Sequence, residues 1–242
     1  AAISLELERR RMPSRPPLNA IAAIAVAMAM ITSTTSTSSK VKPGTRLICI
    51  DGKAGAGKTT LSGRLAAELA SRRVSHQIIH MDDLYAGWGG LLTARDVVVN
   101  DLLHPLRRGD RARYRHFDWA RNDYTHTVTV PEVEVVILEG CGSAPPEVDP
   151  VASLVVYVEA PDDLRLARGL DRDGAAARAP WIQFMAHEER LALRDRTRER
   201  ADVVLNESAD VLRWPSASWA NAHDARGQRE DRLNSQATIH GE

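Results

Sequence analysis

Five short apolar segments alternate with helical patterns between residue 40 and about residue 206, and each segment has the length of a β-strand. Several of them carry apolar side chains on both faces, as the strands of a sheet covered on both sides do. The segments are 46–50, 77–81, 133–138, 154–158 and 202–205. This alternation is typical of βαβ units, so it predicts a three-layer α/β domain with a five-stranded parallel sheet.

The two ends of the chain lack this alternation. An uncharged stretch, 18–31, follows three arginines, and its apolar residues share one helical face. This favours a helix packed on the domain; an organelle transit segment is the second interpretation, and a secretory signal is the third. The last residues are polar and without period, which predicts a disordered tail. We therefore expect an N-terminal extension (1–39), a central α/β domain (40–210) and a polar tail (211–242).

Composition narrows the classes of partner. The 242 residues include 32 acidic and 32 basic side chains, so charge gives no reason to expect a nucleic-acid partner. No apolar run reaches the ~20 residues that span a bilayer, and we expect no membrane partner. Two cysteines make no disulfide framework, which favours a reducing compartment. We expect a cytoplasmic protein, with transit to an organelle as the alternative and a homo-oligomer as an open option.

Residues 52–59 match G-x-x-x-x-G-K-[ST], the loop whose backbone amides hold nucleotide phosphates, between a predicted strand and a predicted helix. The glycines can take positive φ, Lys58 brings a charge to the β and γ phosphates, and the Thr59 hydroxyl is a Mg²⁺ ligand of this kind of loop. The residues expected to hold the nucleotide are Gly52, Gly55, Ala56, Gly57, Lys58, Thr59 and Thr60. The plainer alternative is a glycine-rich turn without a ligand.

Carboxylates follow two of the predicted strands. Asp82 and Asp83 come after the second segment, and Glu139 ends the third. In a parallel sheet these positions lie at the edge where ligands bind. They can form a Mg²⁺ shell or take a proton from an attacking hydroxyl. The alternative for the Asp82–Asp83 pair is a helix N-cap with a first-turn charge.

An arginine-rich helix is expected after the fourth segment. Arg165, Arg168 and Arg172 stand at i, i+3 and i+7, so one helical face presents three guanidinium groups. Such groups can stabilise the charge on a transferring phosphoryl group. The alternative is a solvated basic face that pairs with nearby aspartates.

Together these residues resemble the uridine kinase-like branch of the P-loop nucleoside and nucleotide kinases, over roughly 46–206. The matching elements are 52–59, 82–85, 138–140, 165–168 and 201–204. The resemblance implies a P-loop NTPase fold with an Arg-rich lid, and ATP and Mg²⁺ as cofactors. It implies Asp82 as general base, and Thr59, Glu139 and Asp82 as the residues of the Mg²⁺ site. Lys58, Arg165 and Arg168 would be catalytic, and Arg172 would contact ATP.

The acceptor pocket departs from the family pattern. Tyr114 and Arg121 keep the expected separation, but Trp119 stands where the family has a histidine, and Leu84 replaces an aromatic residue. The residues expected to contact the acceptor are Asp83, Tyr85, Trp88, Tyr114, Asp118 and Arg121. The alternative for 114–119 is an aromatic cluster that packs under a loop.

The resulting hypothesis is an ATP-dependent kinase that phosphorylates a hydroxyl of a nucleoside-like small molecule. A nucleoside monophosphate kinase or another metabolite kinase is the alternative within the same class. An ATP-binding regulatory P-loop protein is the alternative of another class. Two features count against it: the position of Asp82 and Asp83, and the absence from the sequence of a guanine-reading Asn-Lys-x-Asp motif.

Overall fold

The computed structural model describes residues 45–214. The predicted N-terminal extension, with its alternatives, lies outside the described residues, as does the predicted tail from residue 215 onward. Within 45–214, no helix is long and apolar enough to cross a bilayer.

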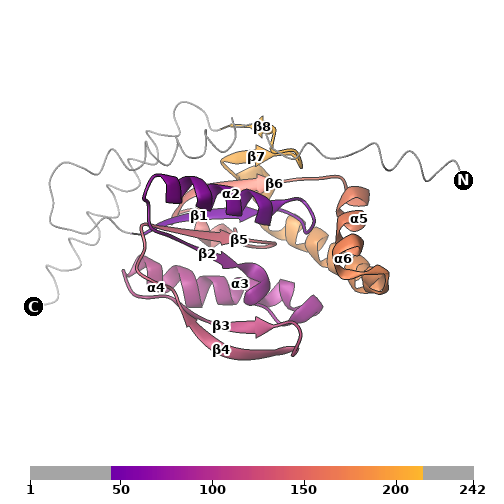
Figure 1. The fold of residues 1–242 in the computed structure, drawn as a ribbon, viewed down its shortest axis with the longest axis horizontal. Helices are drawn as coiled ribbons and strands as arrows, with labels where there is room; N and C mark the ends of the chain where they lie inside the picture. Colours follow the sequence, from indigo (N-terminus) through magenta and orange to yellow (C-terminus); the bar gives the residue numbers. More distant parts are fainter. Residues whose placement is uncertain (1–44, 215–242) are drawn as a thin grey trace, which may run out of the picture.

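The central sheet has its strands in the order β2–β5–β1–β6–β7–β8 (Figure 1). The strands are β1 Arg46–Asp51, β2 His76–His80, β5 Val135–Glu139, β6 Ala152–Val158, β7 Val203–Leu205 and β8 Val211–Arg213. The first five run parallel and overlap the five predicted segments, with bounds that differ by one or two residues. Because β1 lies between β5 and β6, the carboxyl ends of these three strands meet at the middle of one sheet edge.

The sheet has six strands, so the prediction of five is wrong. The sixth strand, β8, lies inside 211–242, the segment predicted as a disordered tail. It pairs antiparallel with β7, and the sheet is therefore mostly rather than wholly parallel. Three residues at a sheet edge, with Val211 and Leu212 exposed, carry no periodicity that a sequence pattern can detect.

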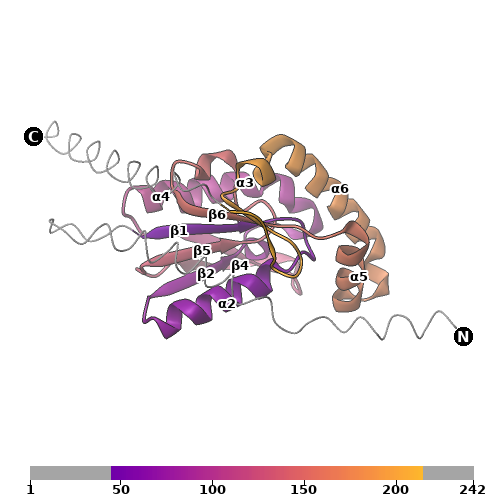
Figure 2. The ribbon, with the colours of Figure 1, turned by 90° about the horizontal axis from the view of Figure 1, so that it is seen from above.

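Helices cover both faces of the sheet, which confirms the predicted three layers (Figures 1 and 2). Helix α2 covers one face, where Leu61 and Leu65 pack with Ile48 and Ile50 of β1. The alternate side chains of β1 point to the other face, which α3, α4 and α6 cover. The helices are α2 Lys58–Ser71, α3 Ala94–Val97, α4 His104–Arg107, α5 Asp162–Asp173, α6 Arg178–Asp195 and α7 Thr197–Arg200.

Short helical turns connect these elements. The 3₁₀ turns are η1 Met81–Asp83, η2 Gly87–Thr93, η4 Pro146–Val148 and η5 Ala175–Ala177, and the π-helix η3 Val98–Leu103 joins α3 to α4. Helix α5 stands beyond the carboxyl ends of the strands, and α6 returns from there along the sheet (Figure 1). The predicted Arg-rich helix is thus α5, next to the glycine-rich loop 52–57.

A separate antiparallel ribbon, β3 Arg113–Asp118 and β4 Asp123–Thr129, lies beside α3 and α4 (Figure 1). Sequence analysis predicts no strands here. Tyr114 and Phe117 are buried, whereas the β4 side chains are mostly exposed, so neither strand shows a strict alternation. The ribbon turn carries Trp119 back to the sheet edge, where its indole Nε1 donates to the Asp82 carbonyl at 2.9 Å.

Candidate active site

Residues 52–57 form the loop between β1 and α2, as the motif predicts. Gly52, Gly55 and Gly57 have φ of 138°, 77° and 107°, the positive values expected of them. The glycine at position 55 is also required by space. A Cβ there would lie 2.7 Å from the Arg165 carbonyl oxygen and 2.9 Å from the Arg165 Cα. The loop and helix α5 therefore approach each other at backbone distance.

Asp51, the last residue of β1, binds the backbone of the P-loop and of the loop after β5. Its buried carboxylate accepts the backbone N–H groups of Gly52 at 2.6 Å, Gly142 at 3.0 Å and Ala144 at 2.9 Å. Burial raises the pKa of Asp51, and the three N–H donors act in the opposite direction. This carboxylate therefore joins the start of the P-loop to the loop after β5.

Lys58 is 7% exposed at the start of α2. Its Nζ donates to the Lys53 carbonyl at 3.0 Å and lies 3.5 Å from the Cys141 thiol. Burial lowers the pKa of Lys58, but the acidic groups around it, among them Glu188, more than offset this and raise it. The side chain is therefore a protonated cation held against its own loop.

Thr59 and Glu139 meet beside the loop. The Thr59 hydroxyl donates to Glu139 Oε1 at 3.1 Å, and His80 Nδ1 contacts the same oxygen. The hydrogen bond to Glu139 raises the pKa of His80. Among residues 45–214 no group of three or more His, Cys, Asp or Glu side chains forms a metal site. A hydroxyl and one carboxylate nevertheless fit Mg²⁺, which takes few protein oxygens and completes its shell with phosphates and water.

Asp82 and Asp83 lie in η1, at the carboxyl end of β2. The Tyr85 hydroxyl donates to Asp82 Oδ1 at 2.7 Å. His116 Nε2 of the ribbon lies 3.5 Å from Asp83 Oδ1. Burial raises the pKa of Asp83, and the charge of His116 lowers it. Neither carboxylate caps η1 with a side-chain hydrogen bond, but both lie in its first turn, as the alternative of a first-turn charge pair expects.

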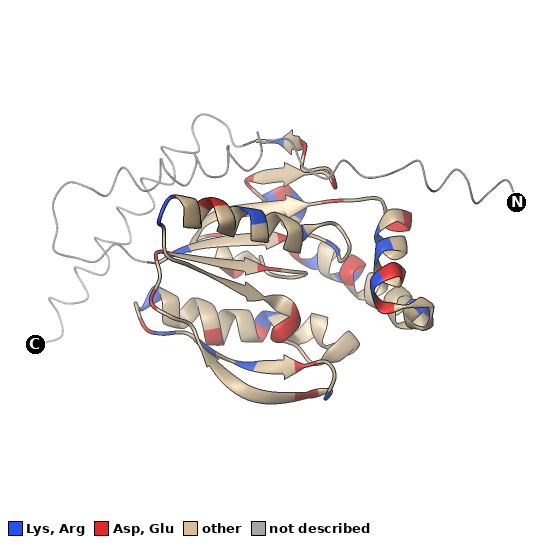
Figure 3. Ribbon diagram, in the orientation of Figure 1, with Lys and Arg blue, Asp and Glu red and all other residues tan. Residues whose placement is uncertain are grey.

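The three arginines of α5 differ in environment. Arg165 is 1% exposed and bonds the Ala54 carbonyl and two carboxylates, Asp162 and Glu188. Arg168 donates to the Gly55 carbonyl at 2.9 Å. Arg172 is exposed and pairs with Asp173. Figure 3 shows blue and red segments mixed along α5 and α6, so the predicted basic face is in part neutralised.

One cavity of about 720 Å³ joins most of these groups. Its nucleotide-side lining comprises Ala54, Gly55, Ala56, Gly57, Lys58, Thr59, Thr60, Leu61, Arg64, Arg168, Arg172 and residues 205–209. Its other end is lined by Asp82, Tyr85, Trp88, Trp119, Glu139, Trp181 and Phe184. Asp82 and Glu139 therefore face the same space as the P-loop, as the sequence predicts.

Not every predicted residue lines this cavity. Asp83, Tyr114, Asp118 and Arg121 do not, and neither do Arg165 and Gly52, the latter of which lines the second cavity described below. Tyr114 is buried in the core. Asp118 and Arg121 face each other at the ribbon turn, 3.7 Å apart. Of the predicted acceptor residues, the cavity contains Tyr85 and Trp88.

Sequence analysis assigns no contact to several residues that form the cavity wall. Trp181 and Phe184 of α6 are buried and pack edge to face on Trp88 at ring distances of 5.9 and 5.7 Å. Trp119, noted only as a departure from the family, packs on Trp88 at 5.7 Å. In sequence, Trp181 and Phe184 are an ordinary i, i+3 core pair, so nothing marks them as cavity residues.

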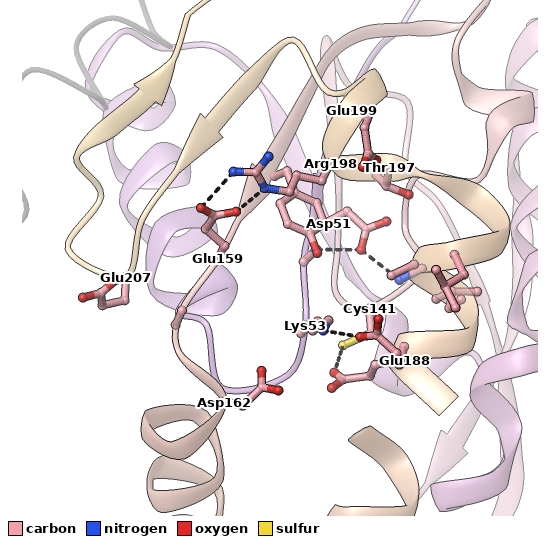
Figure 4. A pocket seen from close by; sticks show the side chains of 18 of the residues that line it. Asp51, Lys53, Cys141, Glu159, Asp162, Glu188, Thr197, Arg198, Glu199 and Glu207 are labelled. Carbon is pink, nitrogen blue, oxygen red and sulfur yellow. Dashed lines mark hydrogen bonds and ion pairs between the residues drawn. The ribbon is translucent and has the colours of Figure 1, made fainter. Parts of the chain in front are cut away.

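A second cavity of about 600 Å³ lies behind the start of the P-loop (Figure 4). Its lining includes Asp51 and Lys53, the end of β6, and the α6 residues Glu188 and Glu189. Cys141 lines both cavities. The thiol and the first half of the P-loop therefore separate the two spaces.

Comparison with known proteins identifies the fold. No protein-family model matches the chain, and no curated protein sequence matches it. A possible uridine kinase from Bacillus stearothermophilus superposes with a TM-score of 0.51 at 19% identity, over 75% of this chain and 98% of that one. A D-glycerate 3-kinase from Cryptococcus neoformans var. grubii gives a TM-score of 0.51 at 11% identity, over 81% and 98%. The chain has a P-loop kinase-like fold.

Proposed function

We propose that this protein is an ATP-dependent small-molecule kinase that transfers the γ-phosphoryl group of Mg·ATP to a hydroxyl of a nucleoside-like acceptor. The observation that carries the proposal is that the P-loop, Asp82 and an aromatic wall line one cavity. A kinase needs its donor and acceptor in line within one site, because positioning and charge stabilisation supply most of the catalysis. A protein of this kind works where ATP is abundant, which favours the cytoplasm.

The donor end of the cavity suits ATP. The P-loop amides and Lys58 would bind the β and γ phosphates, at the N-terminus of α2. Arg168, held on the loop by the Gly55 carbonyl, would add a guanidinium to the phosphate side. Arg64 and residues 206–209 line the rim beyond the phosphates, where the base and ribose would lie.

Thr59 and Glu139 would hold Mg²⁺, with Asp82 near its water shell. When bound, Mg²⁺ would neutralise charge on the β and γ phosphates. His80 contacts the same Glu139 oxygen that Thr59 binds, and so helps to fix the orientation of that carboxylate.

Asp82 is the proposed proton acceptor. Tyr85 binds one of its carboxylate oxygens and orients the group toward the cavity. The acceptor hydroxyl would give its proton to Asp82 while its oxygen forms a bond to the γ-phosphorus. The bond from that phosphorus to the β–γ bridging oxygen breaks, and ADP leaves with the electron pair. Arg168 and Lys58 would stabilise the charge that builds on the transferring group.

The acceptor end favours a planar group. Trp88 is half-buried and Trp119 is 40% exposed, and both line the cavity. Indole faces bind a nucleobase by stacking, without reading its hydrogen-bonding edge. Trp119 stands where the resemblance places a histidine, so base recognition here would rest more on stacking than on hydrogen bonds. Arg172 is on the nucleotide side of the cavity, but its guanidinium lies over the Trp181 ring at 5.8 Å, which leaves a nucleoside monophosphate or another phosphorylated metabolite as the second acceptor class.

The test is acceptor-dependent ADP release. We expect Mg·ATP turnover to rise when nucleosides are added to the full-length chain, and to vanish in Lys58→Ala. If turnover rises only with nucleoside monophosphates, the acceptor belongs to the second class. Turnover that is the same with and without every acceptor would contradict a kinase and favour the regulatory alternative.

A further inference from the structure

We infer that Glu188 of α6 is a positioning residue for phosphoryl transfer, which sets the shape of the P-loop and docks the lid helix α5 on it. The inference rests on the proposed function and adds a residue that neither the sequence motifs nor the cavity around Asp82 contains.

The Glu188 carboxylate bridges three segments of the chain. It is 2% exposed. Its Oε1 accepts the backbone N–H of Ala54 in the P-loop and the Cys141 thiol, the latter at 3.2 Å. Its Oε2 accepts Nη1 of Arg165 on α5 at 2.9 Å. Figure 4 shows the Cys141–Glu188 contact at the inner end of the second cavity.

Arg165 holds the P-loop together with Glu188, and we call these two residues the clamp. The same Nη1 that binds Glu188 also donates to the Ala54 carbonyl at 2.9 Å, so the N–H and the C=O of one P-loop residue are both held. Arg168, one turn further along α5, donates to the next carbonyl, that of Gly55, at 2.9 Å. The first half of the P-loop is thus fixed by side chains of the lid, and not only by its own strand and helix.

The clamp is also linked to Lys58, the cation proposed to bind the phosphates, through the Cys141 thiol. Lys58 Nζ lies 3.5 Å from Cys141 Sγ, and the thiol in turn donates to Glu188. Glu188 is among the acidic groups whose charge raises the pKa of Lys58. Loss of the Glu188 carboxylate would therefore change both the conformation of the P-loop backbone and the electrostatic potential at Lys58.

A buried ion pair is poor evidence for stability, because a well-packed apolar pair of similar volume is often as stable. A pair that binds the P-loop backbone instead contributes preorganised geometry, which catalysis by positioning requires. We therefore assign Arg165 to the same positioning role and not to direct contact with the phosphoryl group, in accord with its absence from the lining of the 720 Å³ cavity.

The test measures ATP affinity and thermal stability together. Glu188→Gln keeps the shape but places an NH₂ donor either against Arg165 or against both the Ala54 N–H and the Cys141 thiol. We expect Mg·ATP to bind at least about tenfold more weakly, the scale of one lost charged hydrogen bond to the loop. Asp195→Asn is the matched control, because Asp195 is a 3% exposed carboxylate of the same helix that pairs with Arg194 away from the P-loop. It should lose thermal stability but keep wild-type affinity.

If Glu188→Gln does not fold, the double variant Glu188→Met with Arg165→Met replaces it in the measurement of Mg·ATP affinity. It removes both charges, so it should recover thermal stability but still bind Mg·ATP weakly. Wild-type affinity in folded Glu188→Gln, or in the double variant, would overturn the inference. Failure of the wild-type protein to bind Mg·ATP is a different result, because it would refute the proposed function itself.

Discussion

The Tyr85 hydroxyl donates a hydrogen bond of 2.7 Å to Asp82 Oδ1, across three residues at the carboxyl end of β2. Tyr85 is 2% exposed, and burial, followed by the charge of Asp82, raises its pKa well above the usual tyrosine value. The phenol therefore stays protonated and acts as a donor. The buried ring fixes where the carboxylate points, and the proposed base is held in place before a substrate arrives.

Tyr85→Phe removes this donor and keeps the ring. We predict that kcat falls about tenfold while the KM for ATP stays within about twofold, because the hydrogen bond orients the base and not the nucleotide. Steady-state kinetics with saturating acceptor check this. A KM for ATP that rises in proportion to the loss of kcat would show that Tyr85 acts on the nucleotide site.

Asp82→Asn removes the base itself. We predict a loss of at least ~10²-fold in kcat with an affinity for Mg·ATP within several-fold of wild type. Asp83→Asn is the control, because Asp83 faces His116 and does not line the cavity. Equal losses in the two variants would mean that the proton acceptor has been assigned to the wrong residue.

Trp119→Ala opens the acceptor end of the cavity. Stacking on an aromatic side chain is worth roughly 1–3 kcal/mol per base, so we predict an increase of about tenfold in the KM for a nucleoside. The KM for ATP should not change. Trp214→Ala is a suitable control, because Trp214 is exposed to a similar extent, 39% against 40%, and does not line the cavity. An unchanged nucleoside KM in Trp119→Ala would remove this indole from the acceptor site.

Asp173 gives a prediction about acid stability. Arg172 donates to it at 2.7 and 3.0 Å and Trp181 Nε1 at 2.8 Å, and these bonds, the Arg172 bonds foremost, lower its pKa from the usual aspartate range. A carboxyl of this kind stabilises the fold fully above its unfolded-state pKa, and this contribution is lost as the pH falls through the folded-state pKa.

Asp173→Asn should therefore lower the melting temperature near pH 6, and the difference from wild type should shrink as the pH falls below about 4. Thermal unfolding followed by circular dichroism at a series of pH values measures it. A difference that stays constant over this range would show that Asp173 contributes through packing and not through its charge.

The parallel strands and the P-loop could be predicted because their signals are local. The apolar run 46–50 predicts a strand, and the glycines after it predict a loop, from the types of neighbouring residues alone. Asp82 and Glu139 could be placed together because parallel strands end at one edge. The strand β8 could not be predicted, because three exposed edge residues have no period.

The aromatic wall of the cavity and the clamp of Glu188 and Arg165 could not be predicted, because they depend on tertiary structure. Trp181 and Phe184 reach the cavity only because α6 returns beside η2, and Glu188 meets Ala54 across 134 positions of chain. Tyr114 and Arg121 keep the family spacing, yet one is buried in the core and the other faces Asp118. Spacing along the chain does not say which face of a ribbon meets the substrate.

The most direct measurement of the central claim follows the phosphoryl group itself. The wild-type chain is incubated with γ-labelled ATP, Mg²⁺ and one of a panel of nucleosides, nucleoside monophosphates and simple sugars, with Lys58→Ala as the blank, and the products are separated. We predict label on a nucleoside hydroxyl with the wild-type chain, and no transfer with Lys58→Ala. Label found only on inorganic phosphate, or transfer that survives in Lys58→Ala, would contradict phosphoryl transfer by this P-loop.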